Sequence, residues 1–408
     1  MKIPQRYKHT EFGLIPDDWV LCTFKDVLTT FSSGATPYRG IPEYYNGNIR
    51  WISSGELNYN VIYDTIEHIS ANAVRNTNLH ILNPSTFLMA ITGLEAEGTR
   101  GKCAFVGAPA TTNQSCLAIN GTDRMCVEYL FWFYRMWGDY LAFKYCQGTK
   151  QQSYTAEIVK KLPIYCPITI KEQNKIAEAL SDVDALITAL DKKIAKKRLI
   201  KQGAMQQLLT GKKRLCGFSD EWTIKRLGDL AKMNSGGTPD SSNSEYYGGD
   251  IPFLSISDIT STNKYISRTE KTITEKGLRN SSARIFPIKT IMYAMYASLG
   301  KCGIANISLS CSQAILGITP SKNIDTEYLY YILSYIEETV KEFGQTGTQT
   351  NLSKQLVQDL ELYLPTDAKE QQAIATILSD MDKEIADLEA RRNKYKLIKS
   401  GMMQKLLT

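Results

Sequence analysis

The sequence predicts a mixed α/β (α+β) protein made of two globular regions, each followed by a long helix. Three observations support this prediction: the length of 408 residues, a 40-residue block that occurs twice, and an apolar period of 3.5 residues within that block. A chain of this length is too long for one ordinary hydrophobic core and suits two domains with connectors. With 43% hydrophobic and 22% charged residues, its composition is that of a globular protein rather than a disordered or fibrous one.

The chain contains an internal repeat. Residues 171–210 align with residues 369–408 at a constant offset of 198 positions without a gap, and 21 of the 40 positions are identical. Shorter matches link the regions upstream, among them SGATP at 33–37 and SGGTP at 235–239. Between such anchors the two globular regions differ freely. We infer that the two blocks were held to one task, whereas the globular regions were allowed different ones.

Each repeated block predicts a long helix with a narrow apolar seam. Its apolar residues recur in alternating steps of four and three, which is typical of a coiled coil, and neither block contains proline. Pro167 and Pro365 mark where the helices can begin. The predicted segments are a first globular domain at 1–166, a helix at 167–213, a second globular domain at 214–366 and a helix at 367–408.

The two helices are expected to pair antiparallel within the chain, giving an internal pseudo-two-fold repeat, because one helix cannot bury such a stripe alone. The alternatives are that each helix packs on its own globular region or dimerises with another molecule. We expect Leu180, Val183, Ile187 and Leu190 to face Leu378, Met381, Ile385 and Leu388. The full set of predicted pairing residues is Ile176, Leu180, Val183, Ile187, Leu190, Ile194, Ile374, Leu378, Met381, Ile385 and Leu388.

Charge and cysteine content limit the class of protein. The net charge of +6 is mild, and residues 171–214 alone hold 11 Lys/Arg against 5 Asp/Glu. Such a stripe can meet phosphates or an acidic partner, or it can be a solvated helix face. The nine cysteines are odd in number and lack CxxC spacing, which indicates free thiols in a reducing cytoplasm. The most apolar stretch, residues 127–146, carries four charges and predicts a buried helix, so we expect a cytoplasmic protein without a membrane span.

No motif of a catalytic, cofactor or metal site emerges. The string NPST at 83–86 lacks the second proline and the aromatic ring of an amino-methyltransferase pocket. The string AEGTRGKC at 96–103 lacks the first glycine and the final hydroxyl of a P-loop. Asp182 and Asp184 recur as Asp380 and Asp382 and are expected to be helix-surface charges. The histidines have no repeat partners; they are His9, His68 and His80.

Each globular region carries polar, glycine-punctuated loops that suit contact with DNA. Their side chains can hydrogen-bond base edges and phosphates, and glycine allows close approach to a duplex. The alternative is that these loops are ordinary exposed turns. For the tyrosines at 44–45 and 246–247, the alternative to DNA contact is packing within each domain. The candidate DNA-binding residues are Thr36, Tyr38, Arg39, Lys102, Gln114, Lys150, Gln151, Gln152, Ser153, Thr238, Lys301, Gln313, Thr348, Gln349, Thr350 and Asn351.

The order and duplication of these features resemble the specificity subunit of type I restriction–modification systems, over essentially the whole chain. The resemblance rests on the opening YKHTEFGLIPDDW at 7–19, the two SG(A/G)TP loops, and helices that start with EQ and end in LLT. It implies two target-recognition domains that each read one half of a bipartite, asymmetric site in double-stranded DNA. It also implies helices that dock two modification subunits.

The resemblance further implies that the chain is not an enzyme and holds no cofactor. Adenine methylation with S-adenosylmethionine would belong to the modification subunits, and ATP- and Mg-dependent cleavage to restriction subunits. Two rival functions remain. One is a stand-alone, two-headed DNA-binding regulator; the other is an enzyme with its own nuclease or methyltransferase site, which the failed motif search disfavours. Co-purification separates them, because a specificity subunit brings methyltransferase subunits with it.

Overall fold

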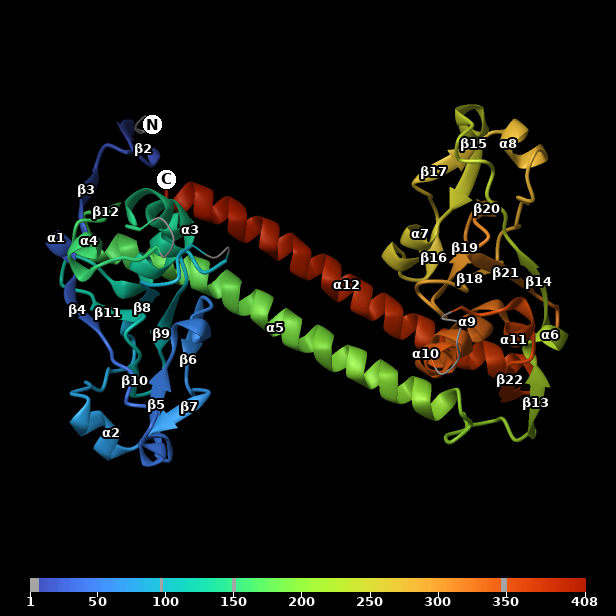
Figure 1. Cartoon of the computed structure of the whole chain (residues 1–408), viewed down its shortest axis with the longest axis horizontal. Coiled ribbons are helices and arrows are strands. Elements are labelled where there is room, and N and C mark those ends of the chain that lie inside the picture. Colours follow the sequence, from blue (N-terminus) through green and yellow to red (C-terminus); the bar gives the residue numbers. More distant parts are fainter. Residues whose placement is uncertain (1–6, 96–97, 149–151, 346–350) are drawn as a thin grey trace. The chain divides into compact units, whose positions relative to one another are not determined.

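The computed structural model describes residues 7–95, 98–148, 152–345 and 351–408 (Figure 1). The chain divides into two units: Met1–Leu190 with Arg391–Thr408, and Asp191–Ala390. Two long helices, α5 (Ile170–Leu208) and α12 (Ala368–Leu406), each begin in one unit and end in the other. Each unit therefore holds one globular region, the beginning of one long helix and the end of the other.

Within its described residues, the first unit combines a five-stranded sheet of order β4-β11-β8-β9-β6 with a three-stranded sheet of order β10-β5-β7. Two-stranded pairs, β1–β2 and β3–β12, complete it. The strands are β1 (Tyr7–Thr10), β2 (Gly13–Pro16), β3 (Trp19–Thr23), β4 (Thr29–Ser33), β5 (Ile49–Ile52), β6 (Asn60–Ile62), β7 (Glu67–Ile69), β8 (Phe87–Ala90), β9 (Cys103–Val106), β10 (Ala110–Thr112), β11 (Cys116–Asn120) and β12 (Pro163–Pro167). The helices before α5 are α1 (Phe24–Val27), η1 (Pro42–Tyr45), η2 (Ser54–Glu56), α2 (Ala71–Asn76), α3 (Val127–Tyr145) and α4 (Ala156–Lys160).

The second unit repeats this topology. Its described sheets have the orders β14-β21-β18-β19-β16 and β17-β15-β20, with β13 paired to β22. The strands are β13 (Trp222–Arg226), β14 (Ala231–Ser235), β15 (Tyr247–Leu254), β16 (Tyr265–Ile266), β17 (Lys271–Ile273), β18 (Ile291–Ala294), β19 (Cys302–Ala305), β20 (Ser310–Cys311), β21 (Ile315–Pro320) and β22 (Glu361–Pro365). The helices before α12 are α6 (Leu227–Leu230), η3 (Ser244–Tyr246), α7 (Ile256–Ser261), α8 (Glu275–Arg279), α9 (Thr326–Tyr335), α10 (Glu337–Gln345) and α11 (Lys354–Gln358). Adding ten to each strand number from β3 to β12 converts one topology into the other, so the predicted mixed α/β repeat is confirmed.

The core of each unit lies between the five-stranded sheet and the helix that follows it. Successive strand residues point to opposite faces, and β8 is buried on both: Phe87 and Met89 pack with α3, whereas Leu88 and Ala90 pack in a second cluster with Ile52. The apolar stretch at 127–146 thus forms the buried helix α3. Among the described residues, no helix combines the length and the apolar character needed to cross a membrane. In each unit the three-stranded sheet lies at the end away from the long helices (Figure 1).

The long helices run antiparallel in both units. In the first unit, Lys399 donates to Asp184 at 2.5 Å, and Leu407 lies in the same core cluster as Leu180. In the second unit, Lys197 donates to Glu384 at 2.7 Å, and Leu208 shares a cluster with Leu378. In both, residue numbers rise along one helix as they fall along the other. The first turns of α5 also pack on their own globular region, so that alternative holds in part.

The facing pairs expected from the sequence are wrong. Leu180 packs in the core of the first unit with Leu407, and Leu378 packs in the core of the second unit with Leu208 and Leu209. Leu180 and Leu378 both lie early in their helices, and an antiparallel pair brings an early residue of one helix against late residues of the other. The seam positions themselves avoid solvent: Ile176, Leu180, Ile187, Leu190, Ile194, Ile374, Leu378 and Ile385 are buried, and Val183, Met381 and Leu388 are half-buried.

Candidate nucleic-acid interface

The SG(A/G)TP loop of each unit is closed against the end of a neighbouring strand. The amide of Ala35 donates to the carbonyl of Thr112 at 3.1 Å, and a Cβ built on Gly34 would lie 1.8 Å from that oxygen. In the second unit, a Cβ on Gly236 would lie 2.3 Å from the carbonyl oxygen of Ser312. The repeated glycine is therefore required by the approach of two backbone segments within the protein, whereas the sequence had suggested an approach to the duplex.

Because the loop closes in this way, a threonine side chain hydrogen-bonds a glutamine side chain in each unit. Thr36 Oγ1 donates to Gln114 Oε1 at 2.5 Å, and Thr238 Oγ1 donates to Gln313 Oε1. All four side chains are exposed, and neither glutamine NH2 group has a hydrogen-bond partner among the described residues. A glutamine whose oxygen is held presents two N–H donors, which suit the acceptors on purine and thymine edges. The sequence singled out each residue but not the pairing.

Arg39 and Tyr38 follow the loop in the first unit. Arg39 makes two hydrogen bonds to Glu67, at 2.5 and 2.8 Å, and its guanidinium lies 4.5 Å from the ring centroid of Tyr45. The bonds to Glu67 raise the pKa of Arg39. Glu67 thus engages two of the five N–H donors of this guanidinium. Tyr45 itself donates to the carbonyl of Pro37 at 2.6 Å, so it packs within the domain, while Tyr38 is 72% exposed.

The other candidates lie on different elements. Lys102 and Lys301 directly precede β9 and β19; Lys102 donates to Asn58 at 2.7 Å. Ser153 exchanges two backbone hydrogen bonds of 3.0 Å with Gln147, which closes the loop after Gly148 at its base, and Asn351 is exposed. The candidates Lys150, Gln151, Thr348, Gln349 and Thr350 lie outside the described residues. The backbone N–H of Gln152 donates to the Glu95 carboxylate at 2.9 Å.

Sequence reasoning missed an ionic contact between the two long helices that occurs once in each unit. Asp184, expected as a surface charge, is half-buried and accepts hydrogen bonds from Lys399 at 2.5 Å and Arg135 at 3.1 Å. Lys399 also lies 5.7 Å from the ring of Trp132. In the second unit, Asp382 accepts from Lys201 and, at 2.7 Å, from Tyr331, whose ring centroid lies 5.3 Å from that lysine. Asp184 and Asp382 are 198 positions apart, and so are Lys201 and Lys399. This is the offset of the internal repeat, so the repeat itself was a signal for the two contacts.

The contact of Asp184 with Lys399 and Arg135 should make the stability of the first unit vary with pH in the acid range. Burial acts to raise the pKa of Asp184, but the hydrogen bond from Lys399 and the charges of Arg135 and Lys399 outweigh it and lower the pKa. Ionised Asp184 therefore stabilises the fold above its unfolded pKa of about 3.9, and this contribution is lost as the pH falls through the lower folded value. We expect Asp184→Asn to flatten the decline in melting temperature below about pH 4. An equally steep decline in the variant would contradict this.

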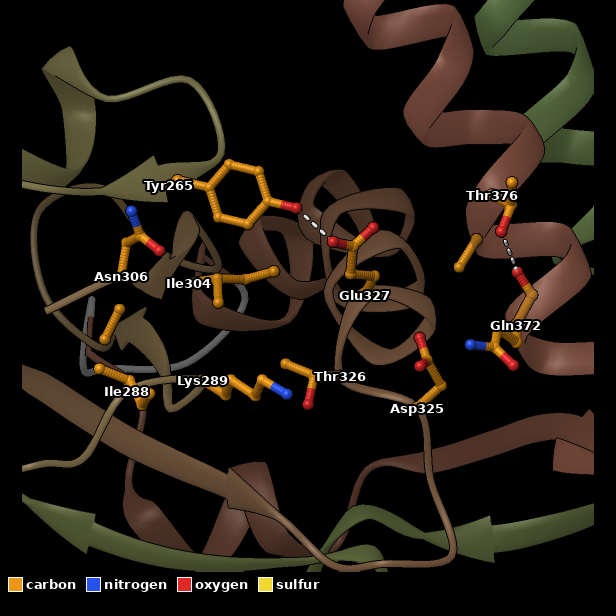
Figure 2. A pocket seen from close by; sticks show the side chains of 12 residues that line it. Tyr265, Ile288, Lys289, Ile304, Asn306, Asp325, Thr326, Glu327, Gln372 and Thr376 are labelled. Atoms are coloured by element: carbon orange, nitrogen blue, oxygen red, sulfur yellow. Dashed lines mark hydrogen bonds between the residues drawn. The ribbon is translucent and has the colours of Figure 1, made fainter.

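A cavity of about 440 Å³ in the second unit was also not foreseen. It lies between the edge of the five-stranded sheet and the first turns of α9 and α12, and Figure 2 shows Tyr265 donating to Glu327 at its centre. Lys289 and Asp325 line it as well, so it carries both signs of charge. Across the described ranges, no group of three or more His, Cys, Asp or Glu side chains could hold a metal ion.

The sequence matches one family model twice. The model describes the type I restriction modification DNA specificity domain, and it matches residues 16–198 and 219–396. The chain belongs to this family. Each match covers a globular region with most of the helix that follows it, so the family domain coincides with the internal repeat. The specificity-subunit resemblance drawn from the repeat is confirmed.

Relatives agree with the family, and a solved structure shares the fold. The chain is 25% identical to the MjaX specificity subunit of Methanocaldococcus jannaschii over 424 aligned positions, which cover 99% of this chain and 96% of that one. It is 35% identical to the MjaIX specificity subunit of the same organism over 165 residues, 40% of this chain and 38% of that relative. The crystal structure of the S subunit from M. genitalium shares the fold, with a TM-score of 0.65 over 96% of both chains at 15% identity.

Proposed function

We propose that this member of the specificity family binds double-stranded DNA at a bipartite, asymmetric site, with each unit reading one half. The observation that carries the proposal is the duplicated Thr–Gln pair, exposed in both units on a duplicated fold. In each copy a base-reading group is held at the junction of two sheets by a loop that the protein's own backbone closes. Such fixed donors suit direct readout in the major groove.

The surroundings of the two glutamines support different half-sites. After the shared proline of the loop, the first unit has Tyr38 and Arg39, whereas the second has Asp240 and Ser241. Asp240 accepts two hydrogen bonds from Ser242, which lower its pKa and keep it anionic. An arginine donates to guanine, whereas an aspartate accepts from cytosine. Identical glutamines beside groups of opposite charge therefore favour an asymmetric target.

In this function, the bond chemistry belongs to partner proteins. We infer that two modification subunits dock on the helices and methylate adenine with S-adenosylmethionine, and that restriction subunits supply ATP- and Mg-dependent cleavage. Support comes from the family, whose relatives are named as specificity subunits, and from the near-identity of the two helices. A stand-alone regulator would purify and act alone. Co-expression with a type I modification subunit distinguishes the two functions, because only a specificity subunit would bind it.

Paired glutamine variants test the reading proposal. Gln114→Ala and Gln313→Ala should each weaken discrimination at one half-site by about 1–3 kcal/mol, the size of a good base contact, and leave the other half unchanged. Binding is measured by titration at fixed salt on duplexes that carry the methylated target or a change in one half. Thr36→Val is the matched partial variant, because it frees Gln114 without removing it. If both glutamine variants alter the same half, or neither alters any, the proposed reading groups are wrong.

A further inference from the structure

Each unit has a short loop, which we call the third loop, beside the loops that carry the threonine and the glutamine. The third loops are residues 78–82 in the first unit and 282–286 in the second. In the first unit, the third loop and residues 33–35 line a small cavity of about 60 Å³. In the second unit, a Cβ built on Gly237 would lie 2.4 Å from the backbone carbonyl carbon of Ser282. The third loop therefore packs against the SG(A/G)TP loop in both units.

The third loops occupy equivalent places in the two units. Leu82 and Ala110 exchange two backbone hydrogen bonds, of 2.7 and 3.3 Å, as Phe286 and Leu309 do, at 2.7 and 3.1 Å. Both pairs are antiparallel, and Ala110 and Leu309 each lie four residues before the glutamine of their unit. In an antiparallel pair, the residue two before one partner lies opposite the residue two after the other. The third-loop residue at that place is therefore opposite a residue only two positions before the glutamine.

These third-loop residues are His80 in the first unit and Arg284 in the second. Arg284 lies opposite Cys311, and Gln313 follows that cysteine after two residues of chain, which span at most about 7 Å. Burial raises the pKa of the Cys311 thiol to about 12, whereas the charge of Arg284 acts to lower it, so the guanidinium lies near this thiol. Arg284 thus adjoins the glutamine that is proposed to read a base in the second unit.

The guanidinium of Arg284 is available to a ligand. Arg284 is exposed and has no hydrogen-bond or ion-pair partner among the described residues. Arg39 of the first unit differs, because Glu67 engages two of its donors. A guanidinium presents paired N–H donors that fit O6 and N7 of guanine, which is the commonest specific contact in the major groove. His80 is exposed too, but a histidine has no such pair of donors.

A DNA phosphate is the rival ligand of this guanidinium. The place of Arg284 favours a base, since the residue adjoins an exposed side chain that can donate to base edges. The third loops also share only one of their five residues, the isoleucine at 81 and 285. Phosphates carry no sequence information, so a phosphate contact gives no reason for the two copies to differ here. Two half-sites of different sequence do give such a reason.

We propose that Arg284 determines specificity in the second half-site by donating to O6 and N7 of a guanine beside the base that Gln313 contacts. His80 occupies the equivalent place in the first unit, so the two half-sites differ at this position. This rests on the proposed function, in which each unit reads one half-site, and it names the base that one side chain recognises.

Base selection by four proteins tests the role of Arg284. They are the wild type, Arg284→Ala, Arg284→Gln and the control Arg279→Ala, which removes an exposed arginine of α8. Each is purified with a type I modification subunit, and the duplexes that it binds are selected from a randomised library and sequenced. The wild type and the control should select the same guanine in the second half-site. Both Arg284 variants should lose at least about fivefold of that preference, the lower end for a paired base contact, and Arg284→Gln should favour adenine, which glutamine contacts through N6 and N7.

The first unit supplies a variant that should gain a preference. His80→Arg places the same guanidinium at the equivalent position, so it should add a selected guanine to the first half-site and leave the second unchanged. A first half-site that stays as in the wild type would show that the two third loops are not equivalent in their approach to DNA, which removes the argument from the repeat.

The other outcomes separate this inference from the proposed function. A wild-type second half-site without guanine, or a selection that Arg284→Ala leaves unchanged, would overturn the inference alone. So would an Arg284→Ala variant that binds all duplexes equally more weakly and with a smaller salt dependence, because that result identifies a phosphate contact. A wild-type complex that selects no sequence in either half would overturn the proposed function as well.

Discussion

Replacing Arg214 with methionine should lower the free energy of unfolding of the second unit by about 3–5 kcal/mol. The reason is Glu370, whose side chain is 1% exposed and accepts from Arg214 at 2.7 and 2.8 Å and from the indole of Trp222 at 3.2 Å. Removing the guanidinium leaves a carboxylate in the protein interior without its charge partner. Urea denaturation measures the loss in free energy of unfolding. Hydrogen exchange of backbone amides then shows whether the loss lies in the second unit.

The repeat supplies a matched control for this pair. Glu172 occupies the position equivalent to Glu370 at the start of the other long helix, but it is exposed. Glu172→Gln should therefore change stability by less than about 0.5 kcal/mol, as is usual for a surface substitution. Replacing Arg214 and Glu370 together by apolar residues should recover most of the loss. Equal effects of Glu172→Gln and Arg214→Met would show that burial does not set the difference.

A charge at Leu180 should be at least as damaging in the first unit. Leu180 is completely buried and shares a core cluster with Tyr129 of α3 and with Leu407, which directly follows α12. Leu180→Asp would place a carboxylate among apolar groups that cannot hydrogen-bond it, which costs several kcal/mol. We expect a lower melting temperature, loss of helical circular dichroism and faster hydrogen exchange in the last turns of α12.

An exposed position on the same helix provides the comparison for Leu180. Ala185→Asp introduces the same charge into solvent, in a place where the other copy has Lys383. This variant should melt within a few degrees of the wild type. If Leu180→Asp melts no lower than Ala185→Asp, the packing of the α12 end against the first unit is wrong.

The repeat and the apolar period were sufficient to predict the architecture. They predicted helices within 167–213 and 367–408, where α5 and α12 lie, and a mixed sheet-and-helix region before each. The register of the helix pair was not predictable in the same way. A 3.5-residue period looks alike at every turn, and what fixes the alignment is non-local: the hydroxyl of Tyr165 donates to the backbone of Leu407, 242 positions away.

The candidate site was predictable as a list but not as a constellation. Thr36 and Gln114 are 78 positions apart, so no local pattern pairs them, although both recur in the second unit. Burial differs even between identical residues: Glu172 and Glu370 align, but only Glu370 meets an arginine, and Arg214 lies outside the repeated block. Repeats therefore identify which positions matter, whereas the contacts of each copy depend on segments that have diverged.

Methylome sequencing of a chimera tests the central claim, that each unit reads its own half of the target. Residues 215–365 are replaced by the equivalent block of another family member, and the chimera is expressed with its modification subunits. We predict a methylated target with one half-sequence changed, the other half unchanged and the same unread gap, because the first globular region and both helices are retained. A chimera that changes both halves together, or neither, would contradict the claim.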